Sequence, residues 1–334
     1  MSAPHIHFET RGDKHLVFQI TDELVEAARR RSNAPAGIET TVGSDLTDLD
    51  ILATATGLVC SNDVITDARF PQHDLGAVAP KLRWIHIIGA GIEPLLPLDW
   101  LPAGVTLTNN SGVHVQKTSE FATMALLMLN ARLPQIVSNQ ARTHWEQVFT
   151  PSIRGKTVVV IGLGDMGGAA ARQARTLGMR VIGIRRRARP HRYVDEMMEL
   201  RDLGQALEQA DFIFVAAPLT PESHHLLDGG MLAQAKAGAG LVNIGRAGVV
   251  DYEALRMALI SGVLSGAILD VFDPEPLPSS SPLWSTPNLI VMPHCSSDDL
   301  DSYMPKTLDL VFENVTRLAA GKPLKNTVDQ QRGY

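Results

Sequence analysis

Three apolar segments in the second half of the chain are each followed by a side chain that could do chemistry. Arg246 follows LVNIG, Glu275 follows ILDVFDP, and His294 follows LIVMP. Ligands of open α/β sheets bind at the carboxyl ends of the strands, so groups in these places are candidates for catalysis. Each residue alone has an ordinary structural explanation, because a single histidine after a strand is usually structural and Glu-Pro is often a solvated turn. The prediction of a site therefore rests on all three together.

A glycine-rich segment lies upstream of these residues. Gly162, Gly164 and Gly167 have the spacing G-x-G-x-x-G, directly after the apolar run TVVVI, and Asp165 and Met166 separate the last two glycines. Such glycines permit a tight turn, let the backbone approach a pyrophosphate, and let the following helix pack against the strand. A glycine-rich turn in an ordinary sheet is the alternative, but this spacing before the helix-like AARQARTLG predicts dinucleotide binding.

A cluster of arginines occupies the position that distinguishes the two nicotinamide dinucleotides. About twenty residues after the glycine loop, an NAD-specific site has a carboxylate that binds the adenosine ribose. Arg185 stands there instead, and Arg186, Arg187 and Arg189 follow it. Because guanidinium groups suit a ribose 2′-phosphate, the sequence predicts a preference for NADP(H), with NAD(H) as a second cofactor. The alternative is a basic loop that faces solvent.

Strands that alternate with helices must position these groups. Such an alternation in the central part of the chain predicts a doubly wound parallel sheet. Its apolar runs lie at residues 157–161, 179–185, 211–217, 239–245, 265–272 and 288–294.

The first part of the chain predicts a second α/β unit. Residues 15–20 read as a strand, TDELVEAARRR as an amphipathic helix capped by its threonine or aspartate, and residues 55–61 and 82–91 as buried strands. A buried helix from Thr118 marks the crossing into the second domain. The helix-like stretch after Asp299 is expected to pack back on the first domain.

The predicted fold class is α/β, with two doubly wound parallel-sheet domains. A Rossmann cofactor domain at residues 115–299 is inserted in a flavodoxin-like substrate domain made of residues 1–114 and 300–334. This division places the glycine loop and the three candidate catalytic residues in the inserted domain.

Composition narrows the class of protein. The 334 residues are 45% apolar, enough to bury a large core, and a formal charge of -6 offers no global attraction to nucleic acid or an anionic membrane. Cys60 and Cys295 lack metal-ligand spacing and are too few for a disulfide scaffold. Without a signal peptide or an apolar stretch of about 18 residues, we expect a cytoplasmic protein with small-molecule partners and no metal.

The chain resembles the D-isomer-specific 2-hydroxyacid dehydrogenase family over about residues 80–330. The resemblance is carried by VVVIGLGDMG, AAPLTPESHHLLD, LVNIGRAGVVDYEAL, GAILDVFDPEPLPSSSPLW and NLIVMPH, in the family's order. It implies an oxidoreductase that transfers a hydride between NADP(H) and a small 2-keto or 2-hydroxy acid of the D series, such as glyoxylate or hydroxypyruvate. It also implies a homodimer built through the cofactor domains.

The resemblance implies a role for each candidate residue. Arg246 would hold the substrate carboxylate and keto oxygen, His294 would be the acid/base, Glu275 would pair with His294, and Asp270 would meet the nicotinamide end of the cofactor. These roles fit the chemistry of the side chains. A guanidinium binds a planar carboxylate in a bidentate manner, and a histidine beside a carboxylate stays protonated near neutral pH and can donate a proton to the developing alkoxide.

The remaining implied contacts are less closely defined by the sequence. The resemblance places further cofactor contacts at Pro218, Ile244 and Ser296. It also places backbone amides of Gly89, Ala90 and Gly91 at the substrate carboxylate, although the family more often has aspartate where Glu93 stands. Ser61 and Asn62 could lie on the same cleft as this glycine turn, but a plain loop is the preferred interpretation, and Cys295 is interpreted as a packed thiol.

Two other functions fit the same motifs. A formate or phosphite dehydrogenase of the same superfamily is one alternative, although Glu275 disfavours formate oxidation, where the resemblance would imply glutamine. A dinucleotide-sensing corepressor-like protein is the other, because a fold does not determine a function. The sequence leaves open the physiological acid, the direction of the reaction, the strictness of the NADP preference and the oligomeric state.

Overall fold

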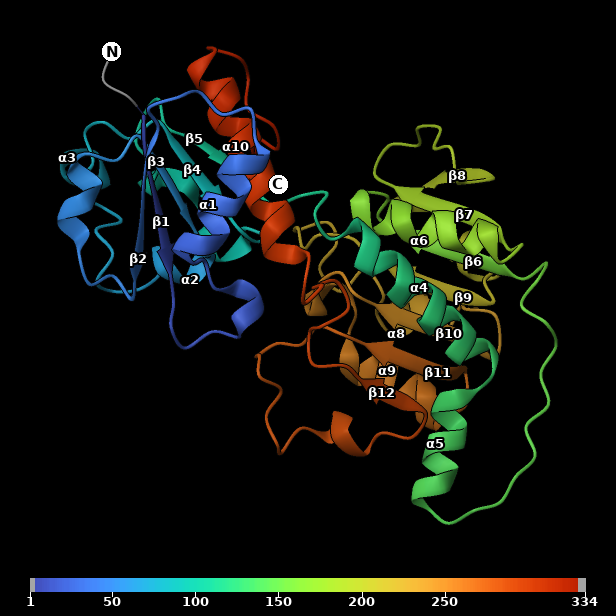
Figure 1. Ribbon diagram of the computed structural model, residues 1–334. Helices are drawn as coiled ribbons and strands as arrows, with labels where there is room; N and C mark the ends of the chain where they lie inside the picture. Colours follow the sequence, from blue (N-terminus) through green and yellow to red (C-terminus); the bar gives the residue numbers. More distant parts are fainter. Residues whose placement is uncertain (1–3, 330–334) are drawn as a thin grey trace. The chain divides into compact units, whose positions relative to one another are not determined.

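The computed structural model describes residues 4–329, which divide into two compact units. The terminal unit contains the chain up to Val113 together with the chain from Asp298 onward. The central unit contains His114–Ser297. Each unit is a parallel sheet covered by helices, which confirms the predicted fold class (Figure 1).

The terminal unit is built on five parallel strands in the order β2-β1-β3-β4-β5. This is the flavodoxin-like strand order. The strands are β1 (His5–Thr10), β2 (Glu39–Ser44), β3 (Gly57–Cys60), β4 (Trp84–Ile87) and β5 (Thr106–Thr108).

Helices cover both faces of this sheet. On one face α1 and α10 pack over β1, whose Ile6 and Phe8 are fully buried against them. Thr21 caps α1 by accepting a hydrogen bond from the N–H of Leu24 at 3.3 Å. The helices of the unit are α1 (Asp22–Arg31), α2 (Asn62–Ile65), α3 (Leu75–Val78) and α10 (Tyr303–Ala319).

The strand predicted at residues 15–20 is wrong. Residues Leu16–Phe18 form a single 3-10 turn, and the first strand is β1, ten residues earlier. The sequence did not predict β1 because every second residue of this strand is polar. The side chains of His5, His7 and Glu9 are nevertheless buried. They are satisfied by a chain of hydrogen bonds, in which Thr41 contacts both histidines and His7 contacts Glu9 at 3.1 Å.

The central unit is built on seven parallel strands in the order β12-β11-β10-β9-β6-β7-β8. Numbered from β6, this is the Rossmann order, in which the chain starts at the centre, goes to one edge and returns to fill the other. The strands are β6 (Thr157–Ile161), β7 (Arg180–Arg185), β8 (Glu196–Glu199), β9 (Phe212–Val215), β10 (Ala239–Asn243), β11 (Leu264–Leu269) and β12 (Leu289–Val291).

Two apolar cores fix this sheet between its helices. Helices α4 and α6 pack against each other over one face, with Leu126 and Ala171 fully buried there. Helices α7 and α9 pack on the other face. The helices of the unit are α4 (Val115–Asn130), α5 (Leu133–Ala141), α6 (Asp165–Thr176), α7 (Leu203–Leu207), α8 (Gly229–Leu232) and α9 (Tyr252–Ile260). None of the helices within residues 4–329 has the length and apolar character needed to cross a membrane.

Candidate active site

The glycine loop connects β6 to α6 and has no room for side chains at two of its glycines. Gly162 has a φ of +85°, and a Cβ atom there would lie 2.7 Å from the backbone of Ala217. A Cβ atom on Gly167 would lie 1.8 Å from the carbonyl oxygen of Gly162, so the first turn of the helix touches the loop. Each residue must therefore be glycine for the strand and helix to meet as they do.

The remaining glycine of the triplet, Gly164, leaves the start of α6 open. Gly164 is the N-cap of this 12-residue helix and, as a glycine, has no side chain that could cap the first amides; a Cβ atom there would meet nothing within 4 Å. The first amides of the helix therefore face space that an anion can enter, and the helix dipole favours negative charge there. Asp165 is exposed beside them and Met166 is partly buried. This cradle fits the pyrophosphate of a dinucleotide.

The predicted phosphate-binding arginines lie in two different environments. Arg185 is the last residue of β7, and its guanidinium folds over the glycine loop and donates a hydrogen bond from Nη2 to the carbonyl of Leu163. Arg186, Arg187 and Arg189 are exposed in the loop that follows. Arg185 thus braces the cofactor loop as well as standing at its edge, a contact that the sequence did not predict.

The structure brings His294 and Glu275 together. Nδ1 of His294 lies 2.7 Å from Oε2 of Glu275, and the other carboxylate oxygen accepts a hydrogen bond from the N–H of Phe272, also at 2.7 Å. The carboxylate is therefore held by its own loop, and the imidazole by the carboxylate. With 53% of the His294 side chain exposed, the ring can reach both a ligand and solvent protons.

This pairing shifts the titration of both groups. The hydrogen bond that His294 donates to Glu275 and the charge of that carboxylate raise the pKa of His294, against burial and the charge of Arg246, which lower it. Burial alone would raise the pKa of Glu275, but the hydrogen bonds from His294 and Phe272 and the nearby positive charges lower it. The pair therefore favours imidazolium beside carboxylate, a form that can donate a proton near neutral pH.

Asp270 holds the segment that carries the histidine. Its side chain is 1% exposed and accepts hydrogen bonds from the N–H of Cys295 at 2.9 Å and of Ser296 at 3.2 Å. Burial raises the pKa of Asp270, although these hydrogen bonds and the charge of His294 oppose the shift. Asp270 and Ser296, both predicted cofactor contacts, thus contact each other and fix the backbone next to His294.

Arg246 follows β10 and is positioned by two residues that sequence reasoning missed. Its Nη1 donates to the carbonyl of Gly245 at 2.7 Å, and its own carbonyl accepts from Nδ2 of Asn243 at 3.1 Å. The same amide contacts the hydroxyl of Tyr252, which donates to the carbonyl of Val271. The available signal was a polar residue inside the apolar run LVNIG, since Asn243 is completely buried.

Several other predicted residues have plain structural surroundings. Pro218 is exposed after β9, and its carbonyl accepts a hydrogen bond from Ser223 at 2.7 Å. Ile244 is 2% exposed and packs in the core, which leaves only its backbone for a ligand. Cys295 was expected to be a packed thiol, but its side chain is exposed, and its N–H donates a hydrogen bond to Asp270. Within residues 4–329, no group of three or more histidine, cysteine or acidic side chains could hold a metal.

The terminal unit contains the remaining predicted residues. Gly89, Ala90 and Gly91 form a partly exposed bend directly after β4. The interpretation of Asn62 as plain loop is wrong, because Asn62 begins α2 and its Nδ2 donates to the carbonyl of Gly91 at 2.9 Å. The sequence offered Asn62 for this cleft only as the less favoured alternative, because the two segments are far apart along the chain.

Comparisons with known proteins agree with this site. The NAD-binding domain model of the D-isomer specific 2-hydroxyacid dehydrogenases matches residues 123–296. A glyoxylate reductase of Korarchaeum cryptofilum is 32% identical over 260 residues, which cover 76% of this chain and 78% of the relative. Glyoxylate/hydroxypyruvate reductase B of Pectobacterium atrosepticum is 31% identical over 291 residues, 85% of this chain and 88% of the relative.

A solved structure matches the whole chain. The D-isomer specific 2-hydroxyacid dehydrogenase from Xanthobacter autotrophicus Py2, crystallised with NADPH and MES, has a TM-score of 0.82 and 28% sequence identity, with 100% of both chains covered. The likeness therefore includes the first eighty residues, whose sequence matches the family only in its α/β pattern.

The first prediction concerns the titration of His294. In the Glu275→Gln variant the amide keeps a hydrogen-bonding group but removes the negative charge, so the pKa of His294 should fall. The measurement is the NMR shift of the His294 ring protons against pH. Glu253→Gln, which changes an exposed carboxylate paired with Arg256 on α9, is the control and should leave this titration in place. An unchanged His294 titration in Glu275→Gln would contradict the coupling.

Proposed function

The chain belongs to the D-isomer-specific 2-hydroxyacid dehydrogenase family, and from this we propose that it reduces a small 2-keto acid, such as glyoxylate or hydroxypyruvate, with NADPH. It is an oxidoreductase that transfers a hydride between NADP(H) and the D-isomer of a 2-hydroxy acid, with NAD(H) as a second cofactor. The observation that carries this proposal is the 2.7 Å contact between His294 and Glu275 in the unit that also contains the glycine loop.

The side chains of the central unit have complementary roles in this reaction. Arg246 binds the carboxylate of the substrate and polarises the adjacent keto oxygen, because a guanidinium can present two parallel donors to a planar anion. His294 gives its proton to that oxygen as it becomes alkoxide-like. Glu275 keeps the imidazole protonated and oriented before the transfer.

The cofactor would be held by the glycine loop and the residues around it. Bound NADPH supplies the hydride, and the protein supplies orientation and charge. We assign its pyrophosphate to the open amides of α6 and its 2′-phosphate to Arg185, Arg186 and Arg187. The central unit is thus the cofactor domain and the terminal unit the substrate domain, with the amides of residues 89–91 directed at the substrate carboxylate. The near absence of cysteine fits a cytoplasmic location.

The second prediction tests the reaction and its catalytic residues. Wild-type enzyme with NADPH should reduce glyoxylate, hydroxypyruvate or pyruvate much faster than acetaldehyde or acetone, because only the acids carry the anion that Arg246 binds. His294→Ala should lower kcat about a hundred- to ten-thousandfold, the usual cost of losing a general acid. Arg246→Ala should lose most turnover, and both variants should still bind NADPH.

Matched controls separate these effects from general damage. Arg256→Ala removes a partly buried guanidinium of α9 that is paired with Glu253, and His73→Ala removes an exposed imidazole of the terminal unit. Both should keep wild-type turnover. A faster reaction with acetone than with any keto acid, or near wild-type activity of His294→Ala, would contradict the proposed function.

The arginines after β7 support the cofactor preference. Arg185 uses one of its five N–H donors on the Leu163 carbonyl, so the others are available to a phosphate. Arg186 follows it in an exposed position. Hydrogen bonds to charged groups contribute about 1.5–3 kcal/mol each, which solvent and salt reduce at an exposed site. A discrimination of about tenfold or more between the cofactors is expected on this basis.

The third prediction is that kcat/KM is at least about tenfold higher with NADPH than with NADH at fixed salt concentration. Arg185→Asp and Arg186→Ala should shrink or invert this ratio, because they remove guanidinium groups and, in the first case, add a charge that repels the phosphate. Arg180→Ala is the control, since Arg180 is exposed at the opposite end of the same strand. Equal use of both cofactors by the wild type would mean that the arginines only face solvent.

We assign the predicted homodimer to the arm that joins α5 to β6. This segment runs along the outside of the central unit without regular secondary structure over residues 144–152 (Figure 1). It carries Trp145 and Phe149, which are 91% and 86% exposed. Large exposed aromatic side chains are unusual on a monomer and are enriched where protein surfaces associate. On α5, Ile136 and Val137 are also exposed.

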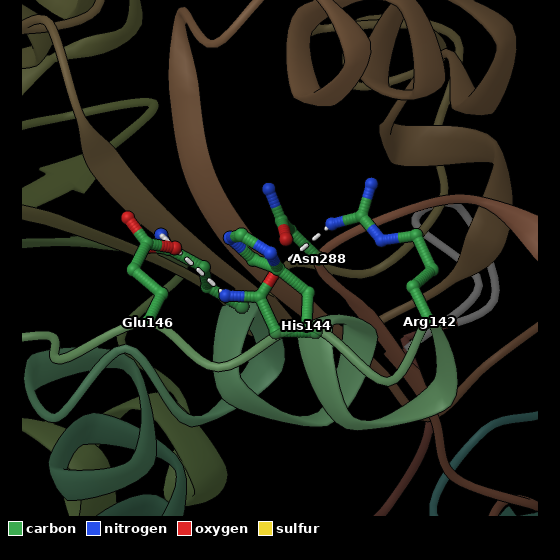
Figure 2. A pocket seen from close by; sticks show the side chains of 6 residues that line it. Arg142, His144, Glu146 and Asn288 are labelled. Atoms are coloured by element: carbon green, nitrogen blue, oxygen red, sulfur yellow. Dashed lines mark hydrogen bonds between the residues drawn. The ribbon is translucent and has the colours of Figure 1, made fainter.

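The base of the arm is fixed, so the outward position of Trp145 is built into the fold. Glu146 accepts hydrogen bonds from Asn139 at 2.8 Å and from Gln135 at 3.1 Å, both on α5. These groups line a pocket of about 500 Å³, where Arg142 also donates a hydrogen bond to Asn139. Figure 2 shows Arg142 and Glu146 beside it. Trp145, the residue before Glu146, is therefore held away from the core of its own chain. This is the position expected of a side chain that docks on a second copy.

The fourth prediction follows for the oligomeric state. Wild-type protein should sediment as a dimer, and the double variant Trp145→Ala with Phe149→Ala should shift toward monomer at the same concentration, because each aromatic ring loses its buried area. Analytical ultracentrifugation measures the change. Trp284→Ala, which removes a 54% exposed tryptophan outside the arm, is the control. A monomeric wild type, or a double variant that stays dimeric, would overturn the assignment.

A further inference from the structure

In the turn after β4, the backbone carbonyl groups are hydrogen-bonded within the terminal unit, whereas the backbone N–H groups of residues 89–91 are not, among the residues that the structure describes. Four consecutive carbonyl oxygens, those of residues 88–91, each accept a hydrogen bond from another segment of the terminal unit. The donors are Oη of Tyr303 to Ile88, the N–H of Asn110 to Gly89 at 3.0 Å, Nδ2 of Asn109 to Ala90 at 2.8 Å, and Nδ2 of Asn62 to Gly91 at 2.9 Å. Every carbonyl of the turn is therefore fixed in direction.

The N–H groups of the same turn have no such partners. Among residues 4–329, no hydrogen bond is donated by the backbone of Gly89, Ala90 or Gly91. Peptide bonds are planar and trans, so each N–H points away from the carbonyl of the residue before it. Holding the carbonyls of Ile88, Gly89 and Ala90 therefore also sets where these three N–H groups point. Buried or half-buried amides are normally paired, and three consecutive free ones form a ready site for an anion.

Three side chains do this holding, and they come from separate elements. Asn62 begins α2, Asn109 follows β5, and Tyr303 begins α10. Asn109 is 6% exposed and Tyr303 is 3% exposed, so neither can turn to solvent without disturbing the core. Asn109 is itself fixed, because its N–H donates to the carbonyl of Asn326 at 3.1 Å.

We propose that Asn62, Asn109 and Tyr303 are positioning residues that hold the carbonyls of the 88–91 turn and so present its free amides to the carboxylate of the keto acid. The inference rests on the proposed function, because the carboxylate is that of the proposed substrate. None of the three side chains needs to touch the substrate. They act on its affinity through the backbone, and the turn contributes fixed dipoles without adding a titrating group.

This role predicts a particular kinetic signature. The carboxylate does not react, so the amides bind it equally in the ground state and the transition state, and weakening them raises KM without changing kcat. One ordinary hydrogen bond corresponds to about a two- to tenfold change in an equilibrium constant. Loss of one brace should therefore raise the KM for the keto acid by about that factor, while the KM for NADPH stays the same.

The experiment compares Tyr303→Phe, which removes one hydroxyl and keeps the ring, with Asn62→Ala, and measures kcat and both KM values with glyoxylate and NADPH. Asn314→Ala is the matched control. Asn314 is a fully buried asparagine of the same unit whose side chain also bonds only backbone, at Lys325. The control should lower Tm without raising the KM for glyoxylate.

The fifth prediction is thus a rise in the glyoxylate KM of about two- to tenfold in each brace variant and a larger rise in the double variant, with kcat and the NADPH KM within about twofold of wild type. An unchanged glyoxylate KM in both brace variants would overturn the inference and leave the proposed function standing. An equal rise in Asn314→Ala would also overturn it, because general softening of the unit would then explain the effect.

A binding measurement separates this inference from the proposed function. Oxalate, a planar dicarboxylate, is titrated by calorimetry into the NADP(H)-loaded wild type and variants. If no keto acid is turned over, the proposed function fails, and weaker oxalate binding in Tyr303→Phe and Asn62→Ala would still support the braced anion turn. Equal oxalate affinity in wild type and both variants, or no oxalate binding to the wild type, would overturn it.

Discussion

The proposed chemistry depends on a carboxylate that does not react. Asp270 directly follows β11 and accepts hydrogen bonds from the N–H groups of Cys295 and Ser296, which follow the neighbouring strand β12. The residue just before them, His294, has a φ of 50°. Residues other than glycine rarely adopt this backbone conformation, so the surrounding structure must maintain it. The buried anchor holds this segment in place, and only then can the imidazole meet Glu275 at 2.7 Å.

The features that could be predicted from the sequence are those set by local spacing. The glycine triplet defines its own turn, since a Cβ atom on Gly162 or Gly167 would collide with backbone within a few residues or on the adjacent strand. Apolar runs of four to six residues mark strands that are buried on both faces, and candidate residues at their ends were therefore assigned to one edge of a sheet. Arg246, Glu275 and His294 were found in this way because parallel strands bring their carboxyl ends together.

What could not be predicted depends on partners far apart in the chain. β1 reads as polar because His5, His7 and Glu9 are buried only through hydrogen bonds that form once the sheet exists. Arg185 was correctly placed at the end of β7, but its bond to the carbonyl of Leu163 requires the glycine loop to be folded. The contact of Asn62 with the turn after β4 joins residues 29 positions apart, and no local pattern marks it.

The groups assigned to anion binding differ in kind from the pair assigned to proton transfer. Backbone amides at the start of α6 and in the turn at residues 89–91 carry fixed partial charges, and an arginine guanidinium such as that of Arg246 carries a full positive charge. The attraction for phosphates and carboxylates therefore persists throughout the reaction, whereas His294 loses its proton and regains it. Each reduction consumes one proton, so His294 must be reprotonated in every cycle, and its exposed ring gives it access to solvent for that step. Because anion binding and proton transfer use different groups, His294 can lose and regain its proton without weakening the binding of the cofactor or the substrate.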